Sequence, residues 1–379
     1  MKKIGIIGAG ISGLFIANLF KRNSNYQITV FEKNHSIDLE GGYGIQLSVN
    51  SVKLLNYIGF NKFQDDKKFN PDKINFYSIK SSNKICDLDI SDFNTQECKY
   101  TTMSRSELIN FLKIDLDGLI KTNHNISKID QENQKIKLNF ENKGIFECDY
   151  LIISDGVFSK SKRLILNNQT QPRFNKTLAI RGIIPSTKKI DCKNISLFLG
   201  PNFHQVIYPI NPSGDLNFIA ILKYNLSINE QKNHLLFNDD NFIKKILNHI
   251  PLEMREFLDE IKQLKIFPVF ISNNFFKLKN DNIHFIGDAL FAFPPSFAQG
   301  ASQSIEGAYE LFKSIKNKTE NSFFKNRVSK IRMVNNRSKF NQFAFHLSNP
   351  ISTFLRNIFL KKLVKNKKFL ESYLGKIYR

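Results

Sequence analysis

The chain has 379 residues, which is enough for two domains at the usual roughly 100–200 residues per domain. It contains 55 Lys and Arg against 34 Asp and Glu, so its formal net charge is +21. Basic residues are abundant along the whole chain, which indicates a compositional bias rather than a localised nucleic-acid site. No run reaches the ~18 apolar residues that cross a bilayer, which excludes a membrane-spanning segment.

The cysteine pattern is typical of a protein from a reducing compartment. The cysteines are scattered without CxxC spacing, which argues against a disulfide framework and against a metal cluster. No signal-like apolar stretch precedes the first predicted strand. We therefore expect a cytoplasmic protein without a metal site. The four residues are Cys86, Cys98, Cys148 and Cys192.

The N-terminal residues predict a β-strand, an α-helix and a second β-strand. Apolar runs at Lys3–Ile7 and Ile28–Phe31 are typical of buried strands, and residues from about Ile11 to Arg22 follow a helical pattern. Because such a unit is compact, we expect its two strands to be parallel neighbours.

Three glycines and a glutamate in this unit indicate a dinucleotide site. Gly8 permits a tight turn, Gly10 lets a pyrophosphate approach the backbone, and Gly13 allows close packing of helix on strand. The helix N-terminus then faces the phosphates. Glu32 ends the second strand, where its carboxylate can accept hydrogen bonds from a ribose, and Lys33 follows it. The alternative is a purely structural glycine turn.

Later runs complete the predicted architecture. Tyr150–Ser154 and Ile283–Ile286 end in acid-containing turns and belong with the first domain. Between them, strand-like runs separated by turn signals predict an inserted antiparallel sheet. After Gly300 the pattern is helical to the C-terminus. The inserted runs are Leu178–Pro185, Ile195–Leu199, Gln205–Ile210 and Leu216–Tyr224.

With these motifs in place, the sequence resembles the single-component flavoprotein aromatic hydroxylases, the salicylate and 3-hydroxybenzoate hydroxylase-like branch of the FAD-dependent monooxygenases. The resemblance covers nearly the whole chain in the family order. Its elements are the stretch 41–47 with Asn50, Arg105 in an R-x-x-L element, Asp155-Gly156 with Ser159 and Arg163, Gly287-Asp288, Pro294-Pro295, and Gln299-Gly300-Ala301.

The resemblance implies an α/β fold, with a Rossmann-like FAD-binding domain, an interleaved β-rich substrate domain and a helical C-terminal region. We expect residues 1–75, 101–174 and 281–345 in the FAD-binding domain, residues 76–100 and 175–280 in the substrate domain, and a basic helical region over 346–379. It further implies FAD contacts at the residues that match the motifs. These are Gly8, Gly10, Gly13, Glu32, Lys33, Arg105, Asp155, Gly156, Gly287, Asp288, Gln299, Gly300 and Ala301.

The chemistry implied by the resemblance is aromatic hydroxylation. NADH or NADPH, bound transiently, reduces FAD, and a flavin C4a-hydroperoxide formed with dioxygen transfers an oxygen atom to an electron-rich phenolic or benzoate-like ring. One departure is visible, since the family often has histidine where this chain has Phe291. An apolar wall would protect the peroxide from water. Its candidates are Phe291, Phe293, Pro294, Pro295 and Phe297, of which Pro294 is assigned to the catalytic site.

His204 and Tyr208 are the candidate catalytic side chains in the inserted sheet. Together with Val206 they share one strand face because strand side chains alternate. His204 could deprotonate a phenol, since its ordinary pKa lies near neutrality, and Tyr208 could donate to a substrate oxygen. The alternative for each residue is a structural role on a half-buried strand.

The C-terminal stretch from Leu355 to Arg379 is basic and has apolar residues at helical spacing. It could rest on an anionic membrane, or pack its apolar stripe on its own protein. Three other functions stay open: a membrane-surface hydroxylase of a polyprenylated quinone precursor, a non-oxygenating FAD-dependent reductase or dehydrogenase, and a catalytically silent flavin-binding regulator. The basic residues are Arg356, Lys361, Lys362, Lys365, Lys367, Lys368, Lys376 and Arg379, against the single acid Glu371.

Overall fold

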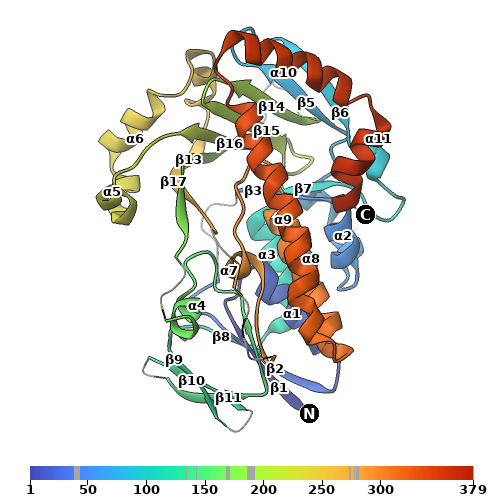
Figure 1. Cartoon of the computed structure of the whole chain (residues 1–379), viewed down its shortest axis with the longest axis vertical. Coiled ribbons are helices and arrows are strands. Elements are labelled where there is room, and N and C mark those ends of the chain that lie inside the picture. Colours follow the sequence, from blue (N-terminus) through green and yellow to red (C-terminus); the bar gives the residue numbers. More distant parts are fainter. Residues whose placement is uncertain are drawn as a thin grey trace.

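A five-stranded parallel sheet contains the predicted N-terminal unit (Figure 1). Strand β1 (Lys2–Ile7) leads through α1 (Ile11–Lys21) to β2 (Tyr26–Phe31), and the two strands pair in parallel. The sheet has the order β18-β12-β1-β2-β8, and every neighbouring pair in it is parallel. This confirms the predicted Rossmann-like core. The other strands are β8 (Ile120–Lys121), β12 (Tyr150–Ile153) and β18 (Ile283–Phe285).

The structure is a computed structural model. It describes residues 1–37, 43–132, 135–141, 143–167, 171–185, 193–272, 275–276, 278 and 281–378. Gly41 and Gly42 of the predicted flavin stretch lie outside the described residues, as do Cys192 and Arg379.

Helices cover one face of the parallel sheet. All residues of α1 from Ile11 to Phe20 are buried, because the helix lies between the sheet and α8 (Gly300–Lys316). A helix that is buried on every side belongs to a protein interior, and residues 11–20 of α1 are apolar or small except for Asn18, while its last residue, Lys21, is exposed. The first turn of α1 is thereby fixed against the ends of β1 and β12.

A three-stranded antiparallel sheet, which the sequence reading missed, packs against the parallel sheet. It consists of β9 (Ile126–Glu132), β10 (Lys135–Phe140) and β11 (Gly144–Cys148). Gly5 of β1 lies against it, since a Cβ at Gly5 would stand 3.2 Å from both Cys148 Sγ and Leu138 Cδ1.

The inserted sheet has seven strands in the order β17-β13-β16-β15-β14-β5-β6. All its pairs are antiparallel except β14 with β5. Strands β5 and β13 run across the expected domain boundaries at 75/76 and 174/175, so that division stays a prediction. The strands are β5 (Lys73–Ser78), β6 (Lys84–Asp89), β13 (Arg173–Ile184), β14 (Ile195–Gly200), β15 (Phe203–Pro209), β16 (Leu216–Lys223) and β17 (Lys262–Ile271).

Short elements connect the two large sheets. A small sheet, with the order β3-β7-β4, lies between them, and the amide of Gly44 in β3 donates to Asn217 Oδ1 of β16 at 2.6 Å. Phe242 and Ile246 of α6 belong to the core beside the inserted sheet. The bounds are β3 (Gly44–Leu47), β4 (Lys68–Phe69), β7 (Thr101–Ser104), α2 (Val49–Asn56), α3 (Arg105–Lys113), α4 (Lys160–Ile165), α5 (Ile228–Lys232), α6 (Asp240–Leu247) and α7 (Gly287–Leu290).

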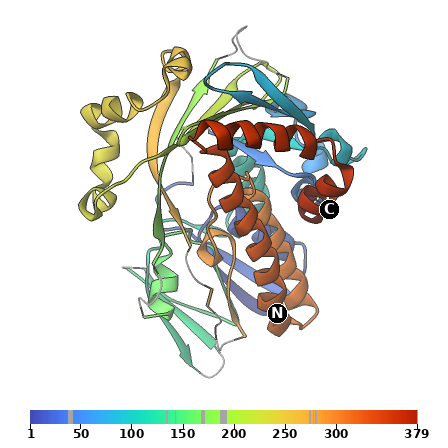
Figure 2. The same cartoon turned by 45° about the horizontal axis from the view of Figure 1, so that its top comes forward.

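The C-terminal helices join the parallel sheet to the inserted one (Figures 1 and 2). Helix α9 (Glu320–Phe345) runs from beside the parallel sheet up to the inserted sheet, and α10 (Pro350–Leu363) then crosses over the end of the inserted sheet beside β6. The chain ends with α11 (Lys367–Leu370) and α12 (Lys376–Tyr378), and Tyr378 is buried beside Phe93 and Tyr100. The predicted helical C-terminus is confirmed. Among the described residues, no helix combines the length and the apolar character that a membrane span requires.

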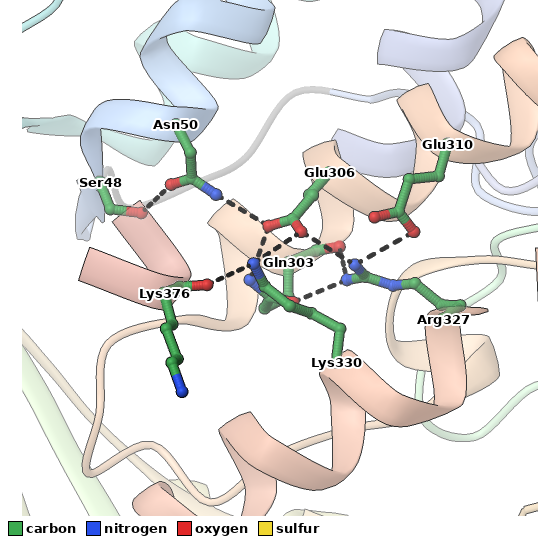
Figure 3. A network of polar contacts seen from close by, with 8 residues as sticks. All are labelled: Ser48, Asn50, Gln303, Glu306, Glu310, Arg327, Lys330 and Lys376. Carbon is green, nitrogen blue, oxygen red and sulfur yellow. Dashed lines mark hydrogen bonds and ion pairs between the residues drawn. The ribbon is translucent and has the colours of Figure 1, made fainter. Parts of the chain in front are cut away.

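A polar network joins α8, α9 and the C-terminal end (Figure 3). The guanidinium of Arg327 is buried and lies 3.5 Å from Glu306 and 3.4 Å from Glu310. Lys330 pairs with Glu306 at 3.2 Å and donates to the carbonyl oxygen of Lys376 at 2.9 Å. Arg327 of α9 is paired with two carboxylates of α8, so the cost of burying its charge is offset. These ion pairs fix α8 and α9 relative to each other.

Candidate active site

A cavity of about 550 Å³ lies where the parallel sheet, the inserted sheet and the C-terminal helices meet. At one end its walls are backbone turns and polar side chains, and towards the inserted sheet they are mainly apolar. Nine of the predicted site residues line it: Gly10, Arg105, Gly156, His204, Tyr208, Asp288, Pro294, Gly300 and Ala301.

The glycine turn between β1 and α1 has the geometry expected of a pyrophosphate site. Gly8 has φ +100°, and a Cβ there would stand 2.6 Å from the carbonyl oxygen of Ser154. A Cβ on Gly13 would overlap the carbonyl of Gly8. By contrast, a Cβ on Gly10 would meet no described atom within 4 Å, although Gly10 lines the cavity. Gly8 and Gly13 therefore shape the turn, while Gly10 leaves space for a ligand.

Glu32 lies beside this turn but outside the cavity lining. Its Oε2 accepts from the amide of Ala9 at 3.0 Å, and its Oε1 accepts from the amide of Asn34 at 3.0 Å. Each carboxylate oxygen keeps a further lone pair, so Glu32 can still accept from sugar hydroxyls. Lys33 is exposed and lies outside the lining.

The N-terminus of α8 faces the cavity through Gly300 and Ala301. The first N–H groups of a helix have no intrahelical acceptor, and they carry the positive end of the helix dipole. A Cβ on Gly300 would meet no described atom within 4 Å. Gln299 is the N-cap residue, but its side chain is buried outside the lining, and its amide has no partner among the described residues.

Asp288 and Arg105 bring opposite charges to the polar end of the cavity. Gly287 begins α7 with φ +58°, and Asp288, the second residue of this helix, lines the cavity. Burial raises the pKa of the Asp288 carboxyl above its ordinary value, whereas the nearby cations Arg105 and Lys162 lower it. An acidic acceptor at this depth suits a ligand hydroxyl.

The Asp155-Gly156 turn follows β12. Asp155 Oδ2 accepts from the amide of Ser161 at 3.0 Å and so holds the start of α4, while Gly156, with φ +83°, lines the cavity. The basic residue turned inward here is Lys162 rather than the exposed Arg163. Burial lowers the pKa of Lys162 to about 8, against the raising effect of Asp155 and Asp288.

The apolar end of the cavity contains Tyr208 of β15 and Arg181 of β13. Burial raises the pKa of the Tyr208 hydroxyl, with Arg181 and Gln46 opposing it. The Arg181 guanidinium has no hydrogen-bond acceptor or carboxylate partner within the described part of the chain, and burial lowers its pKa. Tyr100 donates to Gln46 Oε1 at 2.8 Å beside them. A ligand bound here would lie beside the phenol groups of Tyr100 and Tyr208 and beside the cationic guanidinium of Arg181.

His204 is paired with a second histidine. Its Nδ1 lies 2.7 Å from Nε2 of His346, which follows the last residue of α9. Burial, and secondarily His346, hold the pKa of His204 well below its usual range, and burial lowers that of His346 to about 4. Both rings are therefore neutral at pH 7. With Nδ1 engaged, Nε2 is the His204 atom that remains for a substrate.

Comparisons with known proteins agree with this geometry. Residues 1–320 match the family described as FAD binding domain. The chain belongs to the FAD binding domain family. Salicylate hydroxylase of Pseudomonas putida is 22% identical over 343 residues, which are 82% of this chain and 76% of the relative. The 3-amino-4-hydroxybenzoate 2-monooxygenase of Streptomyces cremeus is 22% identical over 316 residues, covering 82% and 77%.

Among solved structures, Klebsiella pneumoniae HpxO complexed with FAD and uric acid has a TM-score of 0.86 and 16% identity, covering 99% of this chain and 96% of that one. The expected fold class, the resemblance to the aromatic flavoprotein hydroxylases and the FAD cofactor are thus confirmed. The residues present fit FAD, because open space at Gly10 and Gly300 faces two helix N-termini beside Asp288 and Arg105.

The flavoprotein's predicted apolar wall is found in part. Phe293, Pro294, Pro295 and Phe297 line the cavity. Phe291 does not, since it is buried behind the wall and stacks on Phe275 at 4.9 Å between ring centroids. The ring that replaces the family histidine is thus a core residue in this chain.

Several residues at or beside the cavity escaped the sequence reading. Arg181 lies within the predicted run Leu178–Pro185, but strand alternation alone does not reveal that it lacks an acidic partner. His346 and Arg356 come from the helical C-terminal region, and no spacing signal connects them to β15. Within the described residues, no group of three or more His, Cys, Asp or Glu could hold a metal ion.

Proposed function

We propose that this FAD-dependent monooxygenase hydroxylates an electron-rich aromatic ring of the phenolic or benzoate class. One dioxygen and one NADH or NADPH, with a proton, would give the hydroxylated ring, the oxidised nicotinamide and water. The observation that carries the proposal is the continuity of the cavity, since Gly10, Arg105 and Asp288 line the same space as His204 and Tyr208. The FAD half of the cavity, at Gly10, Arg105 and Asp288, is thus continuous with the ring half, at His204 and Tyr208.

Bound FAD supplies the electron transfer and oxygen activation that the side chains cannot provide. The chain would hold the pyrophosphate at the N-terminus of α1, with Glu32 and Asp288 accepting from sugar and ribityl hydroxyls. The N–H groups that begin α8 at Gly300 would face the electron-rich edge of the flavin ring. The apolar wall around Pro294 keeps water away from the reacting atoms.

We assign the proton chemistry of the ring to His204 and Tyr208. The neutral His204 takes the phenolic proton on Nε2 while its Nδ1–H is donated to Nε2 of His346. This transfer makes the phenol oxygen more electron-donating, which activates the ring for oxygen transfer. The protonated hydroxyl of Tyr208 donates to a substrate oxygen, because burial keeps it from ionising.

Purified protein tests the proposal directly. A bound yellow chromophore, with NAD(P)H oxidation and oxygen uptake that a phenol or benzoate stimulates and a hydroxylated product, is the expected result. Bound flavin that NAD(P)H does not reduce would indicate a silent flavin-binding regulator. Flavin reduction without oxygen insertion into any ring would indicate a reductase or dehydrogenase instead.

We also propose that the protein works on the cytoplasmic side of a membrane, in peripheral contact with anionic lipid through its basic C-terminal region. The support is the exposure of five lysines that anionic headgroups would attract. They are Lys361, Lys362, Lys365, Lys367 and Lys368. Flotation with anionic and neutral vesicles tests the contact, and equal recovery with both would contradict it.

A further inference from the structure

Helix α10 is apolar on two opposite faces. The outer face carries Ile351, Phe354, Leu355 and Phe359, which are exposed by 72, 64, 45 and 59%. Phe354 and Leu355 follow Ile351 by three and four positions, and Phe359 follows Leu355 by four, so they form one stripe along the helix. A surface helix normally presents polar residues to water, so four large apolar side chains on this face indicate that water is not its partner.

The exposed apolar side chains of the protein concentrate in this region. Of fifteen large exposed apolar residues among those described, six lie between Phe340 and Phe359. Phe340 and Phe343, near the end of α9, are the two outside α10, and they are exposed by 58 and 67%. The remaining nine are scattered through the rest of the described chain, from Met1 to Phe267.

Charge identifies the occupant of this surface. Residues 346–379 contain eight Lys and Arg but one acid, Glu371. Lys361 and Lys362 lie at the C-terminal end of α10, directly after the apolar stripe, and both are exposed. A symmetric contact with a second copy would bring these cations together, whereas anionic headgroups would neutralise them. Apolar residues flanked by lysines are the pattern of helices that lie in a membrane interface.

The opposite face of α10 is a wall of the active-site cavity. Leu360, Leu363 and Val364 line the cavity, and they lie half a turn away from the exposed stripe. Phe340 lines the cavity and is also 58% exposed, so one side chain belongs to both surfaces. The cavity therefore reaches the exterior beside the apolar surface. From this point to the inserted sheet its lining continues with apolar residues such as Ile74, Leu88 and Leu197.

We infer that α10 rests on an anionic membrane and that the cavity beneath it takes an aromatic ring carrying a long aliphatic substituent. The ring lies at His204 and Tyr208, and the aliphatic part lies between α10 and the inserted sheet, with its entry at Phe340. This inference rests on the proposed hydroxylation and names its substrate class. An alkyl chain in this space buries apolar surface that a small water-soluble ring leaves uncovered.

The docking half is tested by flotation of the FAD-loaded protein with phosphatidylglycerol or phosphatidylcholine vesicles. Phe354→Ser with Phe359→Ser should lower recovery with phosphatidylglycerol about tenfold or more, since two buried rings are lost from the contact. Leu235→Ser with Leu252→Ser removes two residues of 78 and 73% exposure elsewhere and should leave recovery unchanged. Equal loss in both pairs, or no binding by the unaltered protein, would overturn the inference.

The contribution of the α10 lysines to membrane binding is tested with two matched double variants. Lys361→Glu with Lys362→Glu should abolish the preference for phosphatidylglycerol, and added salt should weaken binding of the unaltered protein. Lys244→Glu with Lys245→Glu, at an exposed lysine pair on α6, changes the net charge equally and should preserve most binding. If both pairs lose binding to the same extent, attraction by net charge explains the contact and the α10 surface does not.

The substrate half is tested with a long-chain alkylphenol in phosphatidylglycerol vesicles and the matching phenol without the chain. The unaltered protein should hydroxylate the alkylphenol with at least about tenfold higher kcat/KM. Leu363→Trp narrows the cavity beside α10, so it should lower the ratio of kcat/KM for the alkylphenol to that for the short phenol without changing flotation. Turnover of the short phenol alone would overturn the inference and leave the proposed function standing. Turnover of neither phenol, with flavin bound, would overturn both.

Discussion

The two halves of the cavity are built in different ways. The FAD half consists of short segments in which backbone groups face the ligand, at Gly10, Gly156 and Gly300. The ring half consists of side chains from β13, β15, α9 and α10. The comparison shows that cofactor recognition depends on local turns and helix N-termini, whereas substrate recognition depends on side chains that only the packing of separate elements brings together.

The largest expected effect lies in the FAD half. Gly10→Val should abolish FAD retention, because the side chain would fill space that no described atom occupies. Gly10 has φ −83°, which a valine can adopt, so the apoprotein should fold. Flavin absorbance of the purified protein, with circular dichroism as the folding check, measures this. Normal flavin content would show that the pyrophosphate lies elsewhere.

A change in the ring half should affect rate and spare the cofactor. His204→Gln should lower kcat by about 10²–10⁴-fold, the usual contribution of a general base, with flavin content unchanged. Because the pKa of His204 is held well below its usual range, the unaltered enzyme keeps its neutral base at pH 6–7 and loses rate only as pH falls through that low pKa. The pH profile of kcat checks this, and a rate loss centred near the ordinary histidine pKa would contradict it.

A smaller effect is expected at Asp288, where one substitution should weaken FAD binding and raise the stability of the apoprotein. Asp288→Asn should weaken FAD affinity about tenfold, since a charge-assisted hydrogen bond becomes a neutral one. The folded-state pKa of Asp288 is raised, so the unaltered apoprotein gains stability as pH falls through that pKa and is penalised at neutral pH. The variant apoprotein should therefore melt at a higher temperature at pH 7.

FAD titration and thermal melting measure these two outcomes. Asp66→Asn, at an exposed carboxylate outside the cavity lining, is the matched control and should change neither. A variant at Asp288 that loses both FAD affinity and stability would show that the carboxylate has a structural role.

The smallest expected effect lies at the network that connects the two halves. Lys330→Ala removes the contacts to Glu306 and to the carbonyl of Lys376, and should cost about 1 kcal/mol, because Glu306 keeps its ion pair with Arg327. For a chain of this size that lowers Tm by about 1–3 °C. Unchanged flavin content and kcat should accompany it. A large rate loss would mean that the C-terminal end positions the ring site.

Particular residues show where sequence reasoning succeeded. Gly8 and Gly13 were assigned to the turn from spacing, and both are sterically required there. The family resemblance placed Gln299 at the cofactor, and the structure buries its side chain outside the cavity lining. The resemblance also included Arg163, which is exposed, whereas its neighbour Lys162 is buried. Spacing locates a turn, but it does not decide which of two adjacent side chains faces inward.

The C-terminal region shows the opposite case. The helical spacing of Leu355, Ile358, Phe359 and Leu363 could mean packing on the protein or contact with a membrane. The structure turns Leu355 and Phe359 outward and packs Leu360 and Leu363 inward. A helix with apolar residues on both faces has no single amphipathic direction, so its orientation is set by the surface it covers.

The sequence by itself determined the parallel unit with its glycine turn, because β1, α1 and β2 follow one another directly in the chain and each local preference agrees with the fold. Tertiary structure alone decided the ring half of the cavity. His204 meets His346 across 142 positions of sequence, and Arg356 reaches the same space from another helix. Periodicity assigns a side chain to a face, but only packing determines which other face it meets.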